Sequence, residues 1–547
     1  MLMKTSVASA WGALWKSHRE AKRLLLFTMP MKAGKEAGLN ITTDQIMKED
    51  MPPGYKTPQK IGLLLGPALF FAVILFFFPE GLSHEGRMVL ATTLWVAAWW
   101  ITEAVPIPAA SLLPIVLLPL TGALEGSVVT ASYGDPIVFL FLGGFLIALA
   151  MERWNLHKRI ALHIISVVGT STSRIVLGFM AATGFLSMWV SNTAAVMMML
   201  PIGTAIIYQV SDVMKAERKD LAAEKEKFSK ALIFGIGYAG TIGGLGTLIG
   251  TPPNLILAAS FKTLYGVEIS FGGWMAFAVP VVVILLLAVW LYLTKVAHPI
   301  QMKQLPGGKE LIQAEKRKLG KISFEESMVL LIFSFAAFMW VTRTFLWDGK
   351  IPGIDDTMIA IFAASLLFLI PSLNKGGRIL DWNVSKDLPW GILLLFGGGL
   401  ALAAGFKETG LAEWIGGRLT VLDGFHFVVI VIVSTALVLF LTEITSNTAT
   451  ATMILPVLAS LALALNVHPF ALMVPAAMAA NCAFMLPVGT PPNAIIFASG
   501  KLKISEMVKT GFVINIFTLI LIIGAVFYIL PHLWGVDLTV FPDQLKP

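Results

Sequence analysis

The sequence SNTAAVMMMLP at residues 191–201 recurs, with changes, as SNTATATMILP at residues 446–456. Seven of the eleven aligned positions are identical at an offset of 255 residues. Each copy lies inside a long apolar block, 175–210 or 427–465, that contains no basic residue. Because an unpaired polar group in hydrocarbon costs several kcal/mol, three consecutive polar residues there predict a hairpin tip or a helix break that meets a cavity.

A second pair of motifs repeats in the same order along the chain. GTPPNLILAAS at 250–260 is matched by GTPPNAIIFAS at 489–499, with eight of eleven positions identical at an offset of 239. Paired prolines remove backbone donors and free the carbonyls of the preceding turn, so each motif predicts an unwound break within a membrane span. Broken helices leave amino-terminal ends that attract anions and free carbonyls that coordinate cations.

The two copies differ in the charge of their surroundings. The first block is flanked by 152–174 and 211–230, which are rich in Lys and Arg, whereas 407–426 and 466–468 around the second hold only two. One hairpin should therefore enter the membrane from the inside and its twin from the outside. This is an inverted-topology repeat, a plan in which secondary transporters place their substrate at the repeat interface near the midplane.

The composition excludes a water-soluble fold. Of the 547 residues, 56% are hydrophobic and 13% are charged, whereas soluble globular chains carry about 25% charged residues. Several apolar runs approach the ~20 residues that cross a bilayer. We predict an all-α polytopic membrane protein with spans or apolar blocks near 61–79, 87–101, 107–121, 136–151, 175–210, 231–263, 275–294, 326–342, 357–372, 388–406, 427–465, 469–499 and 510–530.

The basic residues orient these spans, because cytoplasmic loops are enriched in Lys and Arg. If each long block returns the chain to the side it came from, one topology places 33 of the 40 basic residues in the cytoplasm. The N-terminus is then cytoplasmic and the C-terminus extracytoplasmic, in a multi-pass protein of the plasma (inner) membrane. The 33 are ten in 1–60, four in 152–174, six in 211–230, seven in 295–325, three in 372–387 and three in 500–509.

These patterns divide the chain into two related halves and three connecting or terminal segments. The expected limits are a cytoplasmic tail at 1–60, a first half at 61–296 with its hairpin at 175–210 and broken helix at 231–263, a cytoplasmic linker at 297–325, a second half at 326–531 with its hairpin at 427–465 and broken helix at 469–499, and an extracytoplasmic tail at 532–547.

No Arg or Lys lies near the centre of the motif blocks. An anion there would be held by hydroxyls, amides, backbone N–H groups and nearby cations, and bound sodium would lower the cost of bringing it into a low dielectric. Glu443 is the only acid in the two hairpin blocks; a structural hydrogen bond behind the tip and a role in coupling are both open. Cys482, the single cysteine, is expected to be a buried, inert thiol.

Together the motifs resemble those of the divalent anion/sodium symporter family, which includes INDY-like and SLC-thirteen-type di- and tricarboxylate carriers. The resemblance covers roughly residues 60–530 and rests on both Ser-Asn-Thr motifs, both Gly-Thr-Pro-Pro-Asn motifs, Thr442-Glu443 and Thr102-Glu103-Ala104. It implies about eleven transmembrane helices plus two re-entrant hairpins, a homodimer, and an elevator-type alternation between a scaffold and a transport domain.

The resemblance also implies which residues form the site. Two departures stand out, because Thr445 and Gly489 are often alanine in the family. The first sodium site would use the carbonyls of Ser187 and Gly250 and the side chains of Ser191 and Asn192, and the second would use Thr442, Thr445, Asn447 and Gly489. The substrate carboxylates would rest on Asn192, Thr193, Asn447 and Thr448, with Thr251, Thr490 and Pro491 lining the pocket.

The expected function is sodium-coupled symport of C4-dicarboxylates such as succinate, malate or fumarate. A sodium-independent dicarboxylate or citrate exchanger of the same family is the nearest alternative, and a sulfate or tartrate carrier is another. A membrane-embedded enzyme is disfavoured because no HExxH or Asp-rich metal motif is present, and no Walker-type GxxxxGK[ST] loop indicates an ATPase. Sodium is the expected co-transported ion, with no organic cofactor and no nucleic-acid partner.

Overall fold

The computed structural model describes residues 55–169, 171–216, 222–302, 308–374, 376–419, 421 and 424–546. Nearly all of the expected tail at 1–60, and part of the expected linker at 297–325, therefore lie outside the described residues. Within the described ranges every regular element is helical, apart from one isolated antiparallel bridge between Pro371 and Arg378. Helices satisfy their backbone hydrogen bonds internally, as a chain in lipid requires.

The helices follow one another in two comparable series. The first series is α3 (Thr57–Phe76), α4 (His84–Thr102), α5 (Ile107–Ala110), α6 (Leu113–Leu120), α7 (Gly126–Tyr133), α8 (Pro136–Arg153), α9 (Leu156–Val168), α10 (Thr172–Ser187), α11 (Asn192–Ala216), α12 (Ala222–Gly244), α13 (Pro252–Tyr265) and α14 (Phe271–Leu291). The second series is α15 (Gly308–Lys318), α16 (Phe324–Thr342), α17 (Asp356–Leu369), α18 (Trp390–Glu408), α19 (Leu411–Leu419), α20 (Phe427–Leu441), α21 (Asn447–Ala464), α22 (Phe470–Asn481), α23 (Pro491–Ala498), α24 (Ile504–Tyr528) and α25 (Leu530–Trp534).

Seven helical stretches among the described residues are long and apolar enough to cross a membrane, so the chain is a multi-pass membrane protein. They are Thr57–Phe76, Gly126–Arg153, Phe271–Ala297, Phe324–Trp347, Trp390–Glu408, Asn447–Ala464 and Ile504–Trp534. Five shorter apolar helices accompany them, including one half of each hairpin, Asn192–Tyr208 within α11 and Phe427–Leu441 as α20. Large apolar side chains such as Phe76, which is 82% exposed, face outward as lipid-facing residues do.

Side-chain caps fix where several helices begin. Ser83, Asp135 and Asp355 each accept a hydrogen bond from a backbone N–H in the first turn of α4, α8 and α17. Ser323 and Glu326 form a reciprocal capping box at the start of α16. These caps satisfy donors that have no partner within the helix, so they mark the ends of helices whose apolar interiors give no such signal.

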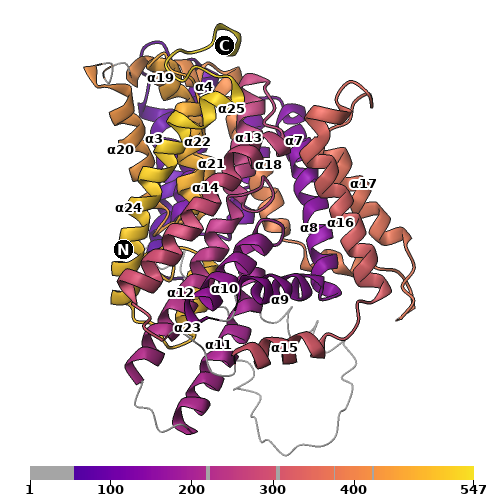
Figure 1. Ribbon diagram of the computed structural model, residues 1–547. Coiled ribbons are helices and arrows are strands. Elements are labelled where there is room, and N and C mark those ends of the chain that lie inside the picture. Colours follow the sequence, from indigo (N-terminus) through magenta and orange to yellow (C-terminus); the bar gives the residue numbers. More distant parts are fainter. Residues whose placement is uncertain are drawn as a thin grey trace, which may run out of the picture. The chain divides into compact units, whose positions relative to one another are not determined.

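The two hairpins lie toward opposite ends of the bundle. In Figure 1, α10, α11 and α12 occupy the lower part of the view, and α20, α21 and α22 occupy the upper part. The short helices that follow the two breaks are exchanged between the halves. Helix α13 of the first half packs against α21 and α22, while α23 of the second half packs against α11 and α12.

Several of the basic segments meet at one end of the bundle. Lys230 of α12 pairs with Glu506 of α24 at 2.7 Å, Lys158 of α9 pairs with Glu315 of α15 at 3.3 Å, and Arg159 pairs with Glu326 at 2.9 Å. Hydrogen bonds from Lys318 and Lys158 lower the pKa of Glu315. Helices α9 and α15 lie at the lower end in Figure 1, and the C-terminus lies at the upper end.

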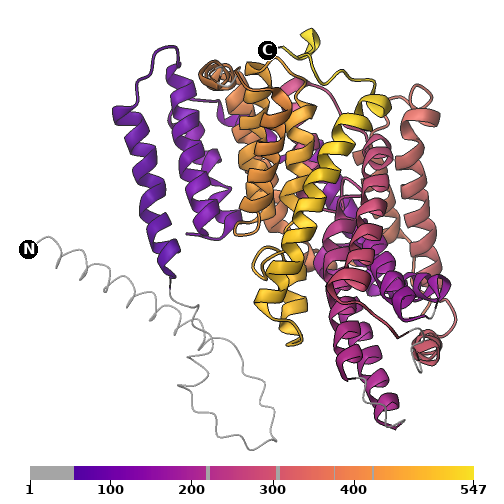
Figure 2. The same cartoon turned by 60° about the vertical axis from the view of Figure 1, so that its left-hand side comes forward.

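Helices α3 and α4 pack against each other along their lengths, and Figure 2 shows them standing together at the left-hand edge of the bundle in indigo and purple. The end of α3 that begins with Thr57 contributes to the central cavity described below. The first series of helices thus reaches the site from the side as well as through its hairpin.

Candidate functional site

Both Ser-Asn-Thr motifs occupy the turn of a helical hairpin. Helix α10 ends at Ser187 and α11 begins at Asn192; α20 ends at Leu441 and α21 begins at Asn447. The asparagine of each motif is therefore the first residue of a helix. Ser191 caps its helix by accepting a hydrogen bond from the backbone N–H of Ala194 at 3.2 Å.

Both Gly-Thr-Pro-Pro-Asn motifs lie where a helix is interrupted. Helix α12 ends at Gly244 and α13 begins at Pro252, while α22 ends at Asn481 and α23 begins at Pro491. The asparagine of each motif holds the unwound loop. Asn254 Nδ2 donates to the carbonyls of Gly244, Leu245 and Thr247, and Asn493 Nδ2 donates to those of Ala483 and Leu486, at distances of 2.8–3.2 Å. The loops are thus ordered by side chains of the motifs themselves.

The two tips and the two breaks line one cavity of about 790 Å³, which is within the range of small-molecule sites. Four helices, α11, α13, α21 and α23, begin at this cavity. Their amino-terminal ends carry partial positive charge, so together they favour an anion without a basic side chain. The motif residues in the lining are Ser191, Asn192, Thr193, Gly250, Thr251, Pro252, Ser446, Asn447, Thr448, Gly489, Thr490, Pro491 and Pro492.

The structure brings the residues of the expected site together. All seven expected substrate-contacting residues line the cavity: Asn192, Thr193, Thr251, Asn447, Thr448, Thr490 and Pro491. Of the expected sodium ligands, Ser191, Asn192, Gly250, Thr445, Asn447 and Gly489 also line it. Ser187 and Thr442 do not; both are fully buried directly behind the tips.

Oxygen atoms converge behind the first tip. Ser187 Oγ lies 2.5 Å from Asn192 Oδ1 and 2.5 Å from the Gly240 carbonyl. The same amide position of Asn192 lies 3.2 Å from the Gly240 carbonyl and 3.3 Å from the Gly250 carbonyl. The single hydroxyl proton of Ser187 serves three acceptor oxygens unless the amide nitrogen of Asn192 is turned toward the cluster. Oxygens that surround a hard cation at ~2.4 Å lie ~3.4 Å apart. The separations of 3.2 and 3.3 Å are close to this value, whereas the two contacts of Ser187 Oγ are hydrogen-bond distances.

The second tip repeats the arrangement and fixes the orientation of its amide. Thr442 Oγ1 lies 2.6 Å from Asn447 Oδ1 and 2.6 Å from the Ala480 carbonyl. Asn447 Nδ2 donates to the Asn481 carbonyl at 3.3 Å, and a carbonyl accepts only, so Oδ1 must face Thr442. The first tip differs, because the opposite orientation of the Asn192 amide lets its nitrogen donate to Ser187 Oγ and to the Gly240 and Gly250 carbonyls. In both tips a hydroxyl, an asparagine amide group and helix-end carbonyls therefore meet at one point.

Glu443 lies behind the second tip and is 3% exposed. Its carboxylate accepts hydrogen bonds from the backbone N–H groups of Phe484, Met485 and Leu486 and from Asn515 Nδ2, at 2.7–3.1 Å. A concave set of backbone N–H groups compensates a buried negative charge. This geometry favours the structural role over a direct role in coupling, because the backbone donors all belong to the unwound segment after α22 and Asn515 links that segment to α24.

The first half holds its own unwound segment without an acid. Met188 stands at the position that matches Glu443, and its carbonyl accepts a hydrogen bond from Thr247 Oγ1 at 2.5 Å. A neutral hydroxyl therefore replaces the carboxylate. The two tips are alike in their oxygen clusters but differ in what supports them from behind.

Three residues of the site escaped the sequence prediction. The carbonyls of Gly240 and Ala480 join the oxygen clusters, and backbone atoms leave no residue-type signal. Asn481 lines the cavity and hydrogen-bonds to both halves. A signal for it was present, since it is the only polar residue of α22.

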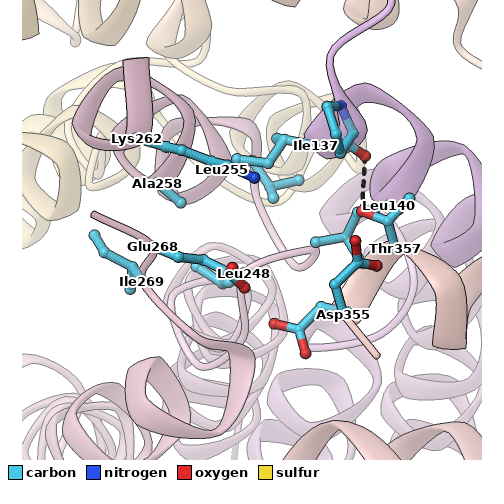
Figure 3. Close-up of a pocket in the computed structure, with 12 residues that line it drawn as sticks. Ile137, Leu140, Leu248, Leu255, Ala258, Lys262, Glu268, Ile269, Asp355 and Thr357 are labelled. Carbon is cyan, nitrogen blue, oxygen red and sulfur yellow. Dashed lines mark hydrogen bonds between the residues drawn. The ribbon is translucent and has the colours of Figure 1, made fainter. Parts of the chain in front are cut away.

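Charged side chains contribute little to this cavity. Among the described residues that line it, only Lys56 and Glu103 carry charge, and their charges are opposite. A second cavity, between α8, α13 and α17, is lined by Lys262, Glu268 and Asp355 (Figure 3), but its volume of about 20 Å³ is close to that of one water molecule. The larger cavity is therefore the candidate site.

Comparison with known proteins identifies a family of membrane transporters. Residues 59–534 match the family model described as the sodium:sulfate symporter transmembrane region. The chain is 56% identical over 490 residues to the sodium-dependent dicarboxylate transporter SdcS of Staphylococcus saprophyticus, covering 89% of this chain and 94% of the relative. It is 57% identical, with the same coverage, to SdcS of Staphylococcus aureus strain MRSA252.

A solved structure shares the fold at low sequence identity. The crystal structure of the Alcanivorax borkumensis YdaH transporter superposes with a TM-score of 0.51 at 14% identity, covering 85% of this chain and all of that one. The family match spans most of the chain, both motif pairs included. The chain therefore belongs to the sodium:sulfate symporter family and is a membrane transporter rather than an enzyme, as its resemblance to the divalent anion/sodium symporters predicts.

Proposed function

We propose that this chain is a secondary active transporter that couples sodium ions to the uptake of C4-dicarboxylates of the succinate, malate and fumarate class. One observation carries the proposal: two clusters of uncharged oxygens and four helix amino-terminal ends meet in one cavity. The relatives at 56% and 57% identity are named sodium-dependent dicarboxylate transporters, which favours this substrate class over sulfate.

The electrostatics of the cavity explain why sodium and substrate would bind together. A dicarboxylate brings two negative charges, and the cavity offers only the opposed charges of Lys56 and Glu103. Each helix amino-terminal end supplies a partial charge of about +0.5. The carboxyl-terminal ends of the preceding helices lie nearby and carry partial negative charge, so the helix ends together do not neutralise a dianion in a low dielectric. Sodium ions in the oxygen clusters would complete the neutralisation, so each ligand would raise the affinity for the other.

The proposed roles follow the two halves. In the first, Ser187, Ser191, Asn192 and Gly250 would hold one sodium ion, with the Gly240 carbonyl added by the geometry. In the second, Thr442, Thr445, Asn447 and Gly489 would hold another, with the Ala480 carbonyl added. The carboxylates would be bound by Asn192, Thr193, Asn447 and Thr448, beside Thr251, Thr490 and Pro491.

The proposed architecture is about eleven transmembrane helices and two re-entrant hairpins, in a homodimer that works by an elevator-type movement, with the domain limits 61–296 and 326–531. The opposed positions of the two hairpins support an inverted repeat. The gathering of basic segments at one end supports a cytoplasmic N-terminus and an extracytoplasmic C-terminus in the plasma membrane. The cavity reaches Lys56 at the start of α3, and with a cytoplasmic N-terminus this supports an opening on the cytoplasmic side.

The test is uptake of labelled succinate by purified protein in liposomes. With an inward sodium gradient we expect accumulation, and replacement of external sodium by choline should reduce it to the level of empty liposomes. Excess unlabelled malate or fumarate should compete, and excess sulfate should not. Uptake that is unchanged in choline would contradict sodium coupling, whatever the substrate.

The same liposomes separate symport from exchange. A sodium-independent exchanger would take up label only when the vesicles are preloaded with dicarboxylate, and its uptake would not respond to the sodium gradient. A symporter should accumulate succinate in vesicles that contain none. Sulfate uptake that exceeds succinate uptake would replace the proposed substrate class while leaving the sodium site in place.

A further inference from the structure

Asn481 ends α22 at the central cavity and is 1% exposed. Its place in the repeat follows from the hydroxyls behind the tips. Ser187 contacts the Gly240 carbonyl and Thr442 contacts the Ala480 carbonyl, so Gly240 and Ala480 correspond. These contacts give an offset of 240 at the helix ends, one more than the 239 of the break motifs, and in this register Thr241 and Asn481 are counterparts. An asparagine stands in the second half where the first half has a threonine.

Asn481 hydrogen-bonds to both halves of the transporter. Its Nδ2 donates to the Thr241 carbonyl at 2.8 Å, and its Oδ1 accepts from Thr251 Oγ1 at 2.6 Å. Its own backbone carbonyl accepts from Asn447 Nδ2 at 3.3 Å. One residue therefore joins the end of α12, the first break and the second tip, which lie far apart in the sequence.

These contacts determine the polarity of the Thr251 hydroxyl. The Thr241 carbonyl can only accept, so the Asn481 amide nitrogen must face it and the amide oxygen must face Thr251. Thr251 then donates its single hydroxyl proton to Asn481. Toward the cavity it offers only lone pairs, which are ligands for a cation or acceptors for a hydroxyl group.

The equivalent threonine of the second half has the opposite polarity. Thr490 Oγ1 accepts a hydrogen bond from the backbone N–H of Asn493 at 3.3 Å, and its own proton has no acceptor among the described residues. Its hydroxyl is free to donate into the cavity. Two threonines that match in the repeat thus present different chemistry to the ligand, and Asn481 is the residue that makes them differ.

We propose that Asn481 is a positioning residue that makes the two halves of the site unequal. It fixes Thr251 as an acceptor that favours a sodium ion, it leaves Thr490 as the donor to a substrate carboxylate, and it holds the Asn447 amide. This role rests on the proposed function. The proposal assigns sodium affinity to Thr251 at the first break and substrate affinity to Thr490 at the second, although the two threonines match in the repeat.

Two substitutions of Asn481 test the hydrogen-bond pattern itself. Asn481→Leu keeps the volume and removes both side-chain bonds, so we expect the sodium concentration for half-maximal uptake to rise about tenfold at every pH, the equivalent of one lost hydrogen bond. Asn481→Asp reproduces the pattern when protonated, because its O–H replaces the N–H that faces Thr241. Its uptake relative to wild type should therefore recover as the pH falls from 8 to 5.5.

The ratio to wild type cancels the protonation of succinate, which is the same for both proteins. The titratable groups around the cavity, Lys56 and Glu103 in its lining and Glu443 behind the second tip, are also unchanged. A flat ratio for Asn481→Asp, or a variant Asn481→Leu with the sodium dependence of wild type, would overturn the proposal. Sodium-dependent thermal stabilisation of the purified variants gives the same comparison without transport.

A double-mutant cycle tests whether Asn481 acts through Thr251. Thr251→Val and Asn481→Leu should each raise the half-maximal sodium concentration about tenfold. The double variant should do no more, because both changes remove the same Thr251–Asn481 bond. Thr490→Val should instead raise the KM for succinate at saturating sodium. Thr435→Val is the matched control, since this buried hydroxyl of α20 has no partner in the described structure and does not line the cavity.

The outcomes separate this inference from the proposed function. A double variant about a hundredfold weaker for sodium than wild type would show independent effects and would remove the coupling while sodium-driven uptake by wild type stands. If Thr251→Val and Thr490→Val changed the half-maximal sodium concentration and the KM for succinate equally, the proposal that the two halves differ in function would be contradicted. Absence of uptake by wild type would instead end the proposed function.

Discussion

At the scale of single residues, the hydroxyls of Ser187 and Thr442 are the clearest link between structure and ion binding. Each lies between an amide oxygen and a helix-end carbonyl and has one proton for two acceptors. A cation among these oxygens would relieve the shortage of donors. The oxygens belong to residues about 50 and 40 positions apart in the chain, so only the fold brings them together.

The first prediction concerns these hydroxyls. Ser187→Ala and Thr442→Val should each raise the half-maximal sodium concentration about tenfold, while the KM for succinate at saturating sodium stays near wild type. The measurement is the sodium dependence of succinate uptake in liposomes. Thr183→Val is the control, because this buried hydroxyl bonds only to the Phe179 carbonyl of its own helix. Equal changes in the control and the two variants would count against a sodium role.

The second prediction concerns Glu443. Glu443→Gln keeps the size of the side chain but leaves a single acceptor oxygen for several backbone N–H groups, so the free energy of unfolding should fall by about 2 kcal/mol. The thermal midpoint of the purified protein, in detergent and without sodium, measures this loss. A variant that is as stable as wild type but has lost the sodium dependence of uptake would contradict the structural role and support a role of Glu443 in coupling.

The sequence predicts the tip residues of this site well and its hidden partners poorly. Asn192 and Asn447 can be recognised from the sequence, because a polar residue within an apolar block needs a hydrogen-bond partner or a ligand. Asn481 is equally polar, but its contacts run to Thr241 and Thr251, 240 and 230 positions away, and no local pattern encodes them. The carbonyls that join the oxygen clusters carry no residue signal at all, since every residue has one.

At the scale of elements, close packing around the breaks depends on small residues. Gly511 of α24 lies where a Cβ atom would strike the backbone carbonyl of Phe484, in the unwound segment that follows α22. Gly524, further along the same helix, has open space around it. The pair offers a matched test of packing within one element.

The third prediction uses this pair. Gly511→Ala should lower the yield of folded protein and the thermal midpoint, because the clash is with backbone and cannot be relieved by a rotamer change. Gly524→Ala should be neutral or stabilising by about 0.5–1 kcal/mol, the usual gain for alanine over glycine in a helix. Size-exclusion profiles and melting curves measure both. The reverse order of stability would show that α24 does not pack as described.

The paired prolines predict where α13 and α23 begin, at Pro252 and Pro491, because proline fits the first turn of a helix. The preceding helices end earlier, at Gly244 and Asn481, where no proline marks the boundary. Other boundaries are less visible. The basic insertion after the first hairpin hides the fact that α11 runs on to Ala216, beyond the expected end at 210. Apolar content alone cannot place that end, since one more turn of helix needs only satisfied backbone bonds.

At the scale of the whole molecule, α16 connects the two ends of the bundle, with exposed lysines beyond each end at Lys321 and Lys350. The native thiol, Cys482, is fully buried, so maleimides should leave it unreacted in the folded protein. Cysteines introduced at the two lysines would therefore report the sidedness of the membrane without further changes to the chain.

The fourth prediction is that an impermeant maleimide added to intact cells labels Lys350→Cys and not Lys321→Cys, and that permeabilised cells label both. The reason is the excess of Lys and Arg in residues 295–325, which favours a cytoplasmic position for this segment in the proposed orientation. Wild type should stay unlabelled in each case and serves as the control. Labelling of the opposite pattern would invert the proposed orientation.

The exchange of α13 and α23 between the halves has a consequence for the origin of such a protein. A primitive chain with one hairpin and one broken helix would leave its last segment without a partner, because that segment packs on the other copy. Two such chains, inserted in opposite directions, would have to associate before the helix packing of either was complete. Gene fusion would then have joined two oppositely inserted copies in one chain. Either half expressed alone should therefore fail to complete its fold.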